Sequence, residues 1–243
     1  MNIGDRFRAA FHRLRDTEWA EPARLPIRLS KACAAVLPVT GAGLSLFSAP
    51  TMRIPIGASD ETATAAERAQ FTVVQGPCFA AHDTGHRIVA TEDVMARRWP
   101  LFHHLIMQTP VRAILATPLR DGLCGVGVLD LYFDQSDDIT LIDFAEVDEV
   151  AAVITTALIR EEMFPNFRNG PIWDGPLWLN NPTVTARAYV MMAMGMLSVS
   201  SGLKLDDSLA ALRAHAYAAG STVDAVASDV VNRLLPTAIL ADN

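Results

Sequence analysis

The chain has 243 residues, of which 51% are hydrophobic and 19% charged, and its formal net charge at pH 7 is -7. This length is long for one compact domain and comfortable for two. The acidic balance argues against a protein that coats nucleic acid nonspecifically, and no run reaches the about eighteen uninterrupted apolar residues of a membrane span.

The cysteines and the N-terminus indicate the compartment. Cys33, Cys78 and Cys124 are an odd number without a paired C-x-x-C spacing, which suits a reducing environment. The first fifteen residues lack the apolar block of a secretion signal, because Asp5, Arg8 and other charged residues interrupt it. We therefore expect a soluble cytoplasmic protein without membrane contact.

The first part of the chain mixes helical apolar spacing with short β-rich runs. Its clearest feature is a pair of strands joined by Arg120-Asp121-Gly122, because Asp-Gly is a typical hairpin turn. In the second of these strands, the side with Leu129, Leu131 and Phe133 suits a core better than the other side. In chain order the patterns predict helices near 3–15, 22–37, 61–72, 99–108 and 139–164, and strands at 43–47, 52–57, 87–90, 113–119 and 126–133. Antiparallel strands with helices on both sides predict an α+β domain over residues 1–164.

A linker rich in proline, glycine and tryptophan is predicted over residues 165–182. Its prolines and glycines, which include Pro171 and Gly175, exclude a continuous helix between the two parts of the chain. A signal between these parts must then travel through domain docking. We hypothesise that Trp173, Leu177 and Trp178 pack onto one of the domains.

The residues after the linker predict an all-α three-helix domain over 183–236. The first helix collects apolar side chains at i, i+3, i+4, i+7 spacing, namely Val190, Ala193, Met194 and Leu197. Gly202 and Gly220 separate the helices, and Pro236 stops the third. The third helix opens at Ser221 in a variant of the capping box. Helices this short must close on one another or on a second chain.

This segment resembles the ANTAR domain, a three-helix RNA-binding output module of bacterial antitermination regulators. The resemblance rests on VMMAMGML at 190–197, SLAALRAHA at 208–216 and VDAVASDVV at 223–231. It implies that the module acts as a homodimer on a structured leader RNA. The charges of residues 183–236 cancel, with four basic residues (Arg187, Lys204, Arg213, Arg233) against four acidic ones (Asp206, Asp207, Asp224, Asp229).

The first domain resembles the GAF domain, in the variety found ahead of ANTAR modules in actinobacterial proteins. The resemblance spans about residues 30–161 and rests on GAGLSLF at 41–47, AERAQFTVVQGPC at 66–78, RWPLF at 98–102 and VRAILATPLRDGLCGVGVLDLYF at 111–133. It implies a sensor domain whose ligand pocket lies between the sheet and the helices over one face. The ligands of this family are diverse, so the resemblance implies no particular cofactor.

Five residues are candidates for that ligand pocket: Phe71, Cys78, Trp99, Phe102 and His103. Aromatic side chains often wall apolar pockets, although core packing explains them as well. Cys78 and Cys124 stand at turns where a thiol is oxidisable, and burial as small apolar side chains is the alternative. An enzymatic alternative, reduction of free methionine sulfoxide by pocket cysteines, is implied by some GAF-fold proteins. His82 and His86 have helical ligand spacing but lack a third ligand, so we predict no metal site.

The sequence thus predicts a regulator without catalytic residues. The first domain senses a small molecule or redox state, and the helical module binds leader RNA hairpins to control transcription antitermination. Arg187, Lys204 and Arg213 are the candidates for phosphate contacts, and Tyr217 for stacking on a base. The alternative is a non-enzymatic sensor whose degenerate ANTAR module serves only for dimerisation or protein contact.

Overall fold

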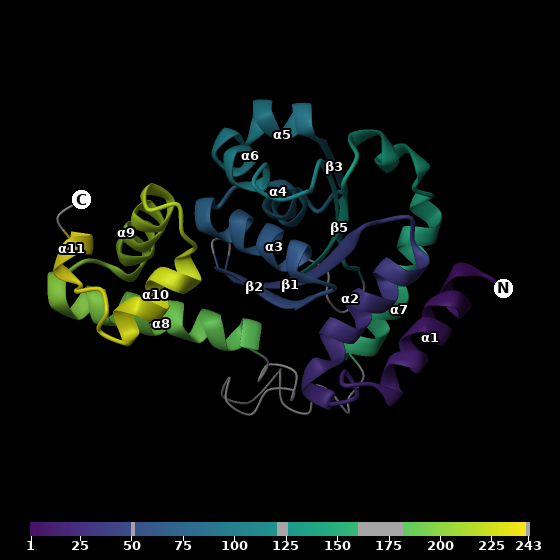
Figure 1. The fold of residues 1–243 in the computed structure, drawn as a ribbon, viewed down its shortest axis with the longest axis horizontal. Helices are drawn as coiled ribbons and strands as arrows, with labels where there is room; N and C mark the ends of the chain where they lie inside the picture. The colour runs from purple at the N-terminus through teal and green to yellow at the C-terminus, as the bar shows by residue number, and fades with distance from the viewer. Residues whose placement is uncertain (50–51, 121–125, 160–181, 242–243) are drawn as a thin grey trace.

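The computed structural model describes residues 1–49, 52–120, 126–159 and 182–241. The first part of the chain is an α+β domain, as predicted, built on an antiparallel sheet with the strand order β2-β1-β5-β4-β3 (Figure 1). The strands are β1 (Gly41–Ala49), β2 (Met52–Ala58), β3 (Ile88–Thr91), β4 (Ala113–Pro118) and β5 (Gly127–Phe133). Strand β5 lies at the centre, between β1 and β4.

Helices α1 (Ile3–Arg13), α2 (Leu25–Val36) and α7 (Phe144–Ile159) cover one face of the sheet (Figure 1). Short 3-10 turns at Leu14–Asp16, Pro22–Arg24 and Ser136–Leu141 flank them. The predicted core side of β5 faces this layer, since Leu129, Leu131 and Phe133 are buried in the same cluster as residues of all three helices. This cluster is the largest described core of the domain.

The opposite face carries α3 (Glu61–Val73), α4 (Pro77–Thr84), α5 (Glu92–Arg98) and α6 (Pro100–Ile106). Asp60 caps α3, because its carboxylate accepts a hydrogen bond from the backbone of Ala63 at 2.8 Å. The sequence predicted no helix at either α4 or α5. Both helices have eight residues or fewer, and a stretch this short carries little periodic signal.

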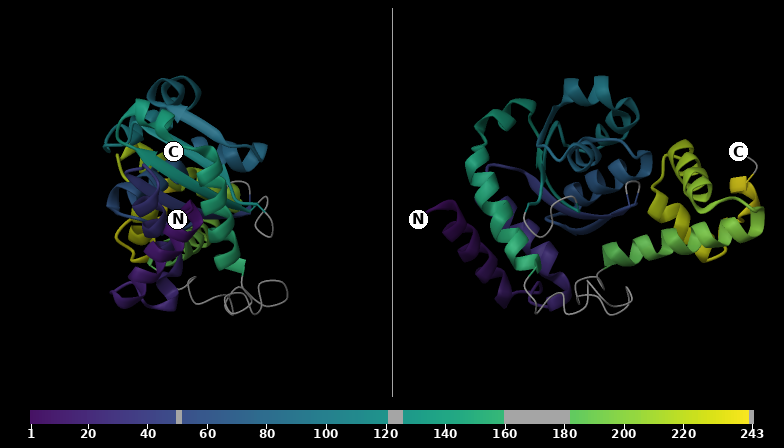
Figure 2. Two further views of the ribbon diagram at one scale, coloured as in Figure 1. Left: turned by 90° about the vertical axis from the view of Figure 1, so that its right-hand side faces the viewer. Right: turned by 180° about the vertical axis from the view of Figure 1, so that it is seen from behind.

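The second part of the chain consists of α8 (Pro182–Ser201), α9 (Leu205–Ala218), α10 (Val223–Val231) and the short α11 (Ala238–Ala241). The predicted apolar face of α8 is confirmed, with Val190, Ala193 and Leu197 fully buried. The cap of α10 differs from the prediction, because the hydroxyl of Thr222, not of Ser221, accepts from the backbone of Ala225. These helices lie at the end of the molecule opposite α1 (Figure 2).

The region that joins the two parts lies outside the described residues, as does the β4–β5 turn with Cys124. The predicted docking of Trp173, Leu177 and Trp178 therefore stays a prediction. Among the described helices, none is by itself long and apolar enough to cross a membrane. The segments Val184–Ser201 and Leu205–Ala218 reach that length and hydropathy only as a pair, which bends by 108°.

Candidate functional site

A cluster of three charged side chains, Arg53, Glu67 and Asp130, lies between the sheet and α3, and we call it the buried ion cluster. Each of the three is at most 1% exposed. The Nη2 of Arg53 donates to Oε2 of Glu67 and, at 2.9 Å, to Oδ2 of Asp130. Its Nη1 donates to the backbone carbonyl of Glu67 at 2.9 Å. Charges this deeply buried are tolerated only when each has a partner, so every member is needed to hold the other two.

Hydroxyl groups from two strands complete the surroundings of Glu67. Ser45 donates to Oε2 at 2.8 Å, and the hydroxyl of Tyr132 donates to Oε1. Gly43 leaves the space for this carboxylate, because a Cβ at that position would collide with Oε1 of Glu67. These hydrogen bonds therefore connect β1 and β5 to α3.

The amide of Gln70 and the thiol of Cys78 surround the other end of the cluster. Gln70 donates from Nε2 to Oδ2 of Asp130 at 3.0 Å, and its Oε1 accepts from the backbone of Cys78 at 2.9 Å. The Nε of Arg53 donates to the sulfur of Cys78 at 2.9 Å. Burial raises the pKa of this thiol well above its ordinary value, against the opposing effect of Arg53. A buried, protonated thiol is a poor nucleophile, which disfavours redox chemistry at Cys78.

The buried ion cluster holds two carboxylates but one guanidinium. Oδ1 of Asp130 is buried and accepts no hydrogen bond from any described residue. Burial raises the pKa of Asp130 to about 7, and the nearby Glu67 adds to the increase while Arg53 opposes it. Asp130 is therefore the member that takes up a proton near neutral pH.

We expect Asp130→Asn to remove a pH dependence from folding. Asp130 keeps its proton up to about pH 7 in the folded chain but loses it near 3.8 when unfolded. Between these values the folded state binds the extra proton, so the free energy of unfolding falls as pH rises, by up to about 4 kcal/mol. Urea titrations from pH 5 to pH 8 are expected to show a smaller decline in Asp130→Asn than in the wild type.

The exposed Asp137→Asn serves as the control for this titration series, since it makes the same change of side chain away from the cluster. It is expected to decline with pH as the wild type does. Parallel declines in the wild type and Asp130→Asn would show that Asp130 stays ionised throughout.

The five residues predicted to line one ligand pocket do not lie together in the structure. Cys78 joins the buried ion cluster, and Phe102 packs without exposure in the core between α6 and the sheet. Trp99 and His103 are half-buried, and Nε2 of His103 is buried without a partner among the described residues. Phe71 faces the helical module instead. The resemblance implies a ligand between the sheet and the helices over one face, and in this domain the charged side chains of the buried ion cluster lie between the sheet and α3.

Phe71 lies between two arginines of the helical module. The guanidinium of Arg187 on α8 stacks 3.4 Å from the centre of the ring, and that of Arg213 on α9 lies 4.7 Å from it. Arg187 also donates to the backbone carbonyl of Arg53 at 3.1 Å, and Arg213 to that of Phe71 at 3.2 Å. We call these contacts the arginine–Phe71 junction. They attach the helical module to β2 and α3.

The junction accounts for two of the four residues predicted to contact RNA. Arg187 is only 2% exposed and pairs with Asp224 of α10. Burial lowers its pKa to about 10, against the effect of Asp224, and burial together with Arg187 lowers that of Arg213 to about 10. Lys204 is exposed at the start of α9, and Tyr217 is half-buried with its ring 6.2 Å from that of His104. The four do not form one surface in this arrangement.

The sequence pattern did not predict the buried ion cluster. One signal was present, because Asp130 interrupts the apolar run of a strand whose neighbours on both sides are hydrophobic. An acid at such a position needs a buried cation, and Arg53 on another strand was the available partner. Among the described residues, no three His, Cys, Asp or Glu side chains come together in a way that could hold a metal ion.

No protein-family model and no curated protein matches the chain. Among solved structures, it is similar to the GAF domain of a phosphoenolpyruvate-protein phosphotransferase (ptsP) from Coxiella burnetii. The TM-score is 0.42 at 10% sequence identity, and the match covers 65% of this chain and 95% of that one. The likeness concerns the fold alone.

Proposed function

We propose that the protein is a signal-responsive regulator with a GAF-type sensor domain and an RNA-binding helical output module of the ANTAR type. The sensor responds to a small molecule, and the released module acts as a homodimer on a structured leader RNA in transcription antitermination. The observation that supports this proposal is the arginine–Phe71 junction, in which one side chain of the sensor holds two cations of the module.

Because of the junction, the step that a signal would regulate is the docking of the helical module onto the front domain. Arginines that contact phosphate must reach the surface, whereas Arg187 is fully covered by Phe71, Asp224 and β2. A module that leaves Phe71 uncovers Arg213 and the part of Arg187 that contacts the ring, while Arg187 keeps its ion pair with Asp224 of the same module. The docked form, with Lys204 as the exposed candidate, has a much weaker basic surface.

Binding to a short RNA hairpin tests this proposal. We expect the full-length wild type to bind weakly and Phe71→Ala about tenfold more tightly, because one additional phosphate contact by arginine contributes on the order of 1.5–3 kcal/mol. The affinity of Phe71→Ala is expected to fall steeply as salt rises. Fluorescence anisotropy at several salt concentrations measures both quantities.

Lys204→Ala in the Phe71→Ala background is the specificity control, and it is expected to reduce the salt dependence by about one phosphate contact. Binding that is absent from both the wild type and Phe71→Ala at low salt would end the RNA proposal.

A second candidate is supported by the outer face of α8. Met191, Met192 and Val199 are 55%, 51% and 89% exposed, and apolar side chains in this number on one helix favour contact with another protein or a second copy. The absence of net charge over residues 183–236 points the same way. A module used only for dimerisation would leave Phe71→Ala without RNA affinity, while Met192→Glu would change the mass measured by light scattering.

A further inference from the structure

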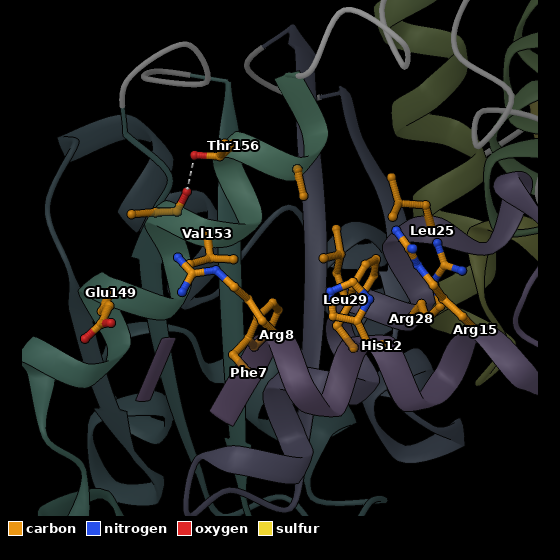
Figure 3. A pocket seen from close by; sticks show the side chains of 13 residues that line it. Phe7, Arg8, His12, Arg15, Leu25, Arg28, Leu29, Glu149, Val153 and Thr156 are labelled. Carbon is orange, nitrogen blue, oxygen red and sulfur yellow. Dashed lines mark hydrogen bonds between the residues drawn. The ribbon is translucent and has the colours of Figure 1, made fainter. Parts of the chain in front are cut away.

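A groove of about 570 Å³ runs along the outer side of the front domain, between α1, α2 and α7 (Figure 3). It lies on the layer that covers the sheet opposite the buried ion cluster, so it is distinct from the pocket implied by the resemblance. Its volume falls within the range of sites for small organic molecules.

The floor of the groove is apolar. Its accessible apolar surface comes from the half-buried Phe11 of α1 and Val153 and Ala157 of α7, whereas Phe7 and Leu29, which also line it, are at most 1% exposed. Such a surface accommodates a hydrocarbon chain, because contact removes apolar area from water on both partners. The body of a ligand for this groove is therefore apolar.

The charged residues of the groove are mostly basic, and two of them lie together at one end. Arg8 is paired with Asp5 at 3.2 Å, and Glu149 accepts from the backbone of Gly4 at 3.1 Å, so these two charges are already satisfied. Arg15 and Arg28 lie at the other end of the groove (Figure 3). No acidic side chain among the described ones pairs with either of them.

Arg28 is the deepest of these cations, with 7% of its surface exposed. Its guanidinium lies over the ring of Phe11 at 4.6 Å, and that of Arg15 lies over the same ring at 5.9 Å. Nη1 of Arg28 donates to the backbone of Ala20 at 3.3 Å, whereas its Nε is buried and has no partner within the described part of the chain. Burial and the nearby Arg15 both lower the pKa of Arg28, which a bound anion would reverse.

We propose that this groove binds an aliphatic carboxylate, with the carboxylate between Arg15 and Arg28 and the hydrocarbon chain along Phe11, Val153 and Ala157. A carboxylate has two acceptor oxygens, so it can accept hydrogen bonds from the guanidinium groups of Arg28 and Arg15 together. The apolar floor then selects for chain length. The proposal concerns ligand binding only and stands whether or not the helical module binds RNA.

Calorimetry with decanoate, below its micellar concentration, tests the proposal on the full-length protein. We expect saturable binding with one site per chain, about tenfold weaker binding of the neutral decanol, and about tenfold weaker binding of decanoate to Arg28→Met, because a hydrogen-bonded charge pair is lost in each. Acetate is expected to bind much more weakly than decanoate, since it leaves the floor uncovered.

Two further variants separate the groove from nonspecific effects. Arg24→Met removes a neighbouring cation that lies over Trp19 at 5.2 Å outside the groove, and it is expected to bind decanoate as the wild type does. Ala157→Phe fills the half-buried side of the groove and is expected to abolish binding while the circular dichroism spectrum is preserved. Three results would each overturn the proposal. They are equal affinity of Arg28→Met and Arg24→Met for decanoate, decanoate binding retained in Ala157→Phe, and no decanoate binding to the wild type. Light scattering shows whether a second copy of the chain occupies the groove. If the wild type is a dimer that Ala157→Phe breaks, and neither binds decanoate, the proposal is also overturned.

Discussion

Arg53→Met is expected to lower the free energy of unfolding by about 3–5 kcal/mol, which is the usual cost of removing one partner from a buried ion pair. Methionine keeps the aliphatic stem of arginine but leaves the space of the guanidinium empty, which adds to the loss. The larger part of the loss comes from Glu67 and Asp130, which are at most 1% exposed and would remain without a cation. Urea denaturation of the wild type and the variant at pH 8 measures the difference, because this pH lies above the raised pKa of Asp130.

The triple variant Arg53→Met, Glu67→Gln, Asp130→Asn tests that origin of the loss. It removes all three charges, so it is expected to recover part of the stability that the single variant loses. Arg24→Met, which removes a partly exposed arginine of the same domain, is expected to change stability by less than about 0.5 kcal/mol. A single variant as stable as the wild type would show that the cluster contributes no net stability.

Phe71→Ala is expected to release the helical module from the front domain. The change removes a fully buried ring that contacts Arg187 and Arg213, and deletion of a buried phenylalanine costs about 3–5 kcal/mol. Because the contacts of Phe71 are mostly to the module, we expect hydrogen exchange to become faster in α8, α9 and α10 while the sheet keeps its protection.

Phe102→Ala is the matched control for this experiment. Phe102 is also fully buried, but it packs only within the front domain. We expect a similar loss of stability with faster exchange in the sheet and α6 and no preference for the module. If Phe71→Ala and Phe102→Ala gave the same exchange pattern, the junction would not be the contact that holds the module.

The sequence predicted the fold because hydrophobic spacing carries most of the information about it. The alternation of Leu129, Leu131 and Phe133 identified the face of β5 that packs on α1, α2 and α7, and the spacing of α8 identified its buried side. Spacing could not predict the other face of β5, where Asp130 is buried through partners that lie 60 or more residues away in sequence. Polar pairs of this kind depend on the finished fold and leave no local pattern.

The surroundings of the candidate RNA contacts could not be predicted from local sequence patterns either. A count of basic residues identified Arg187 and Arg213, but it could not indicate that Asp224 and Phe71 would cover them. The pocket candidates depend on the finished fold in a related way, since Phe71 was assigned by its place in a resemblance and the structure turns it towards the helical module.

Strand β2 is the outermost strand on its side of the sheet and is hydrogen-bonded to a neighbour along only one edge. At Arg53 this strand points its guanidinium into the interior while its carbonyl oxygen accepts from Arg187. An outer strand yields more readily than a central one. A small tilt of β2 would therefore disturb the buried ion cluster and weaken the contact with the helical module at the same time. Residue 53 thus couples the interior of the front domain to the module.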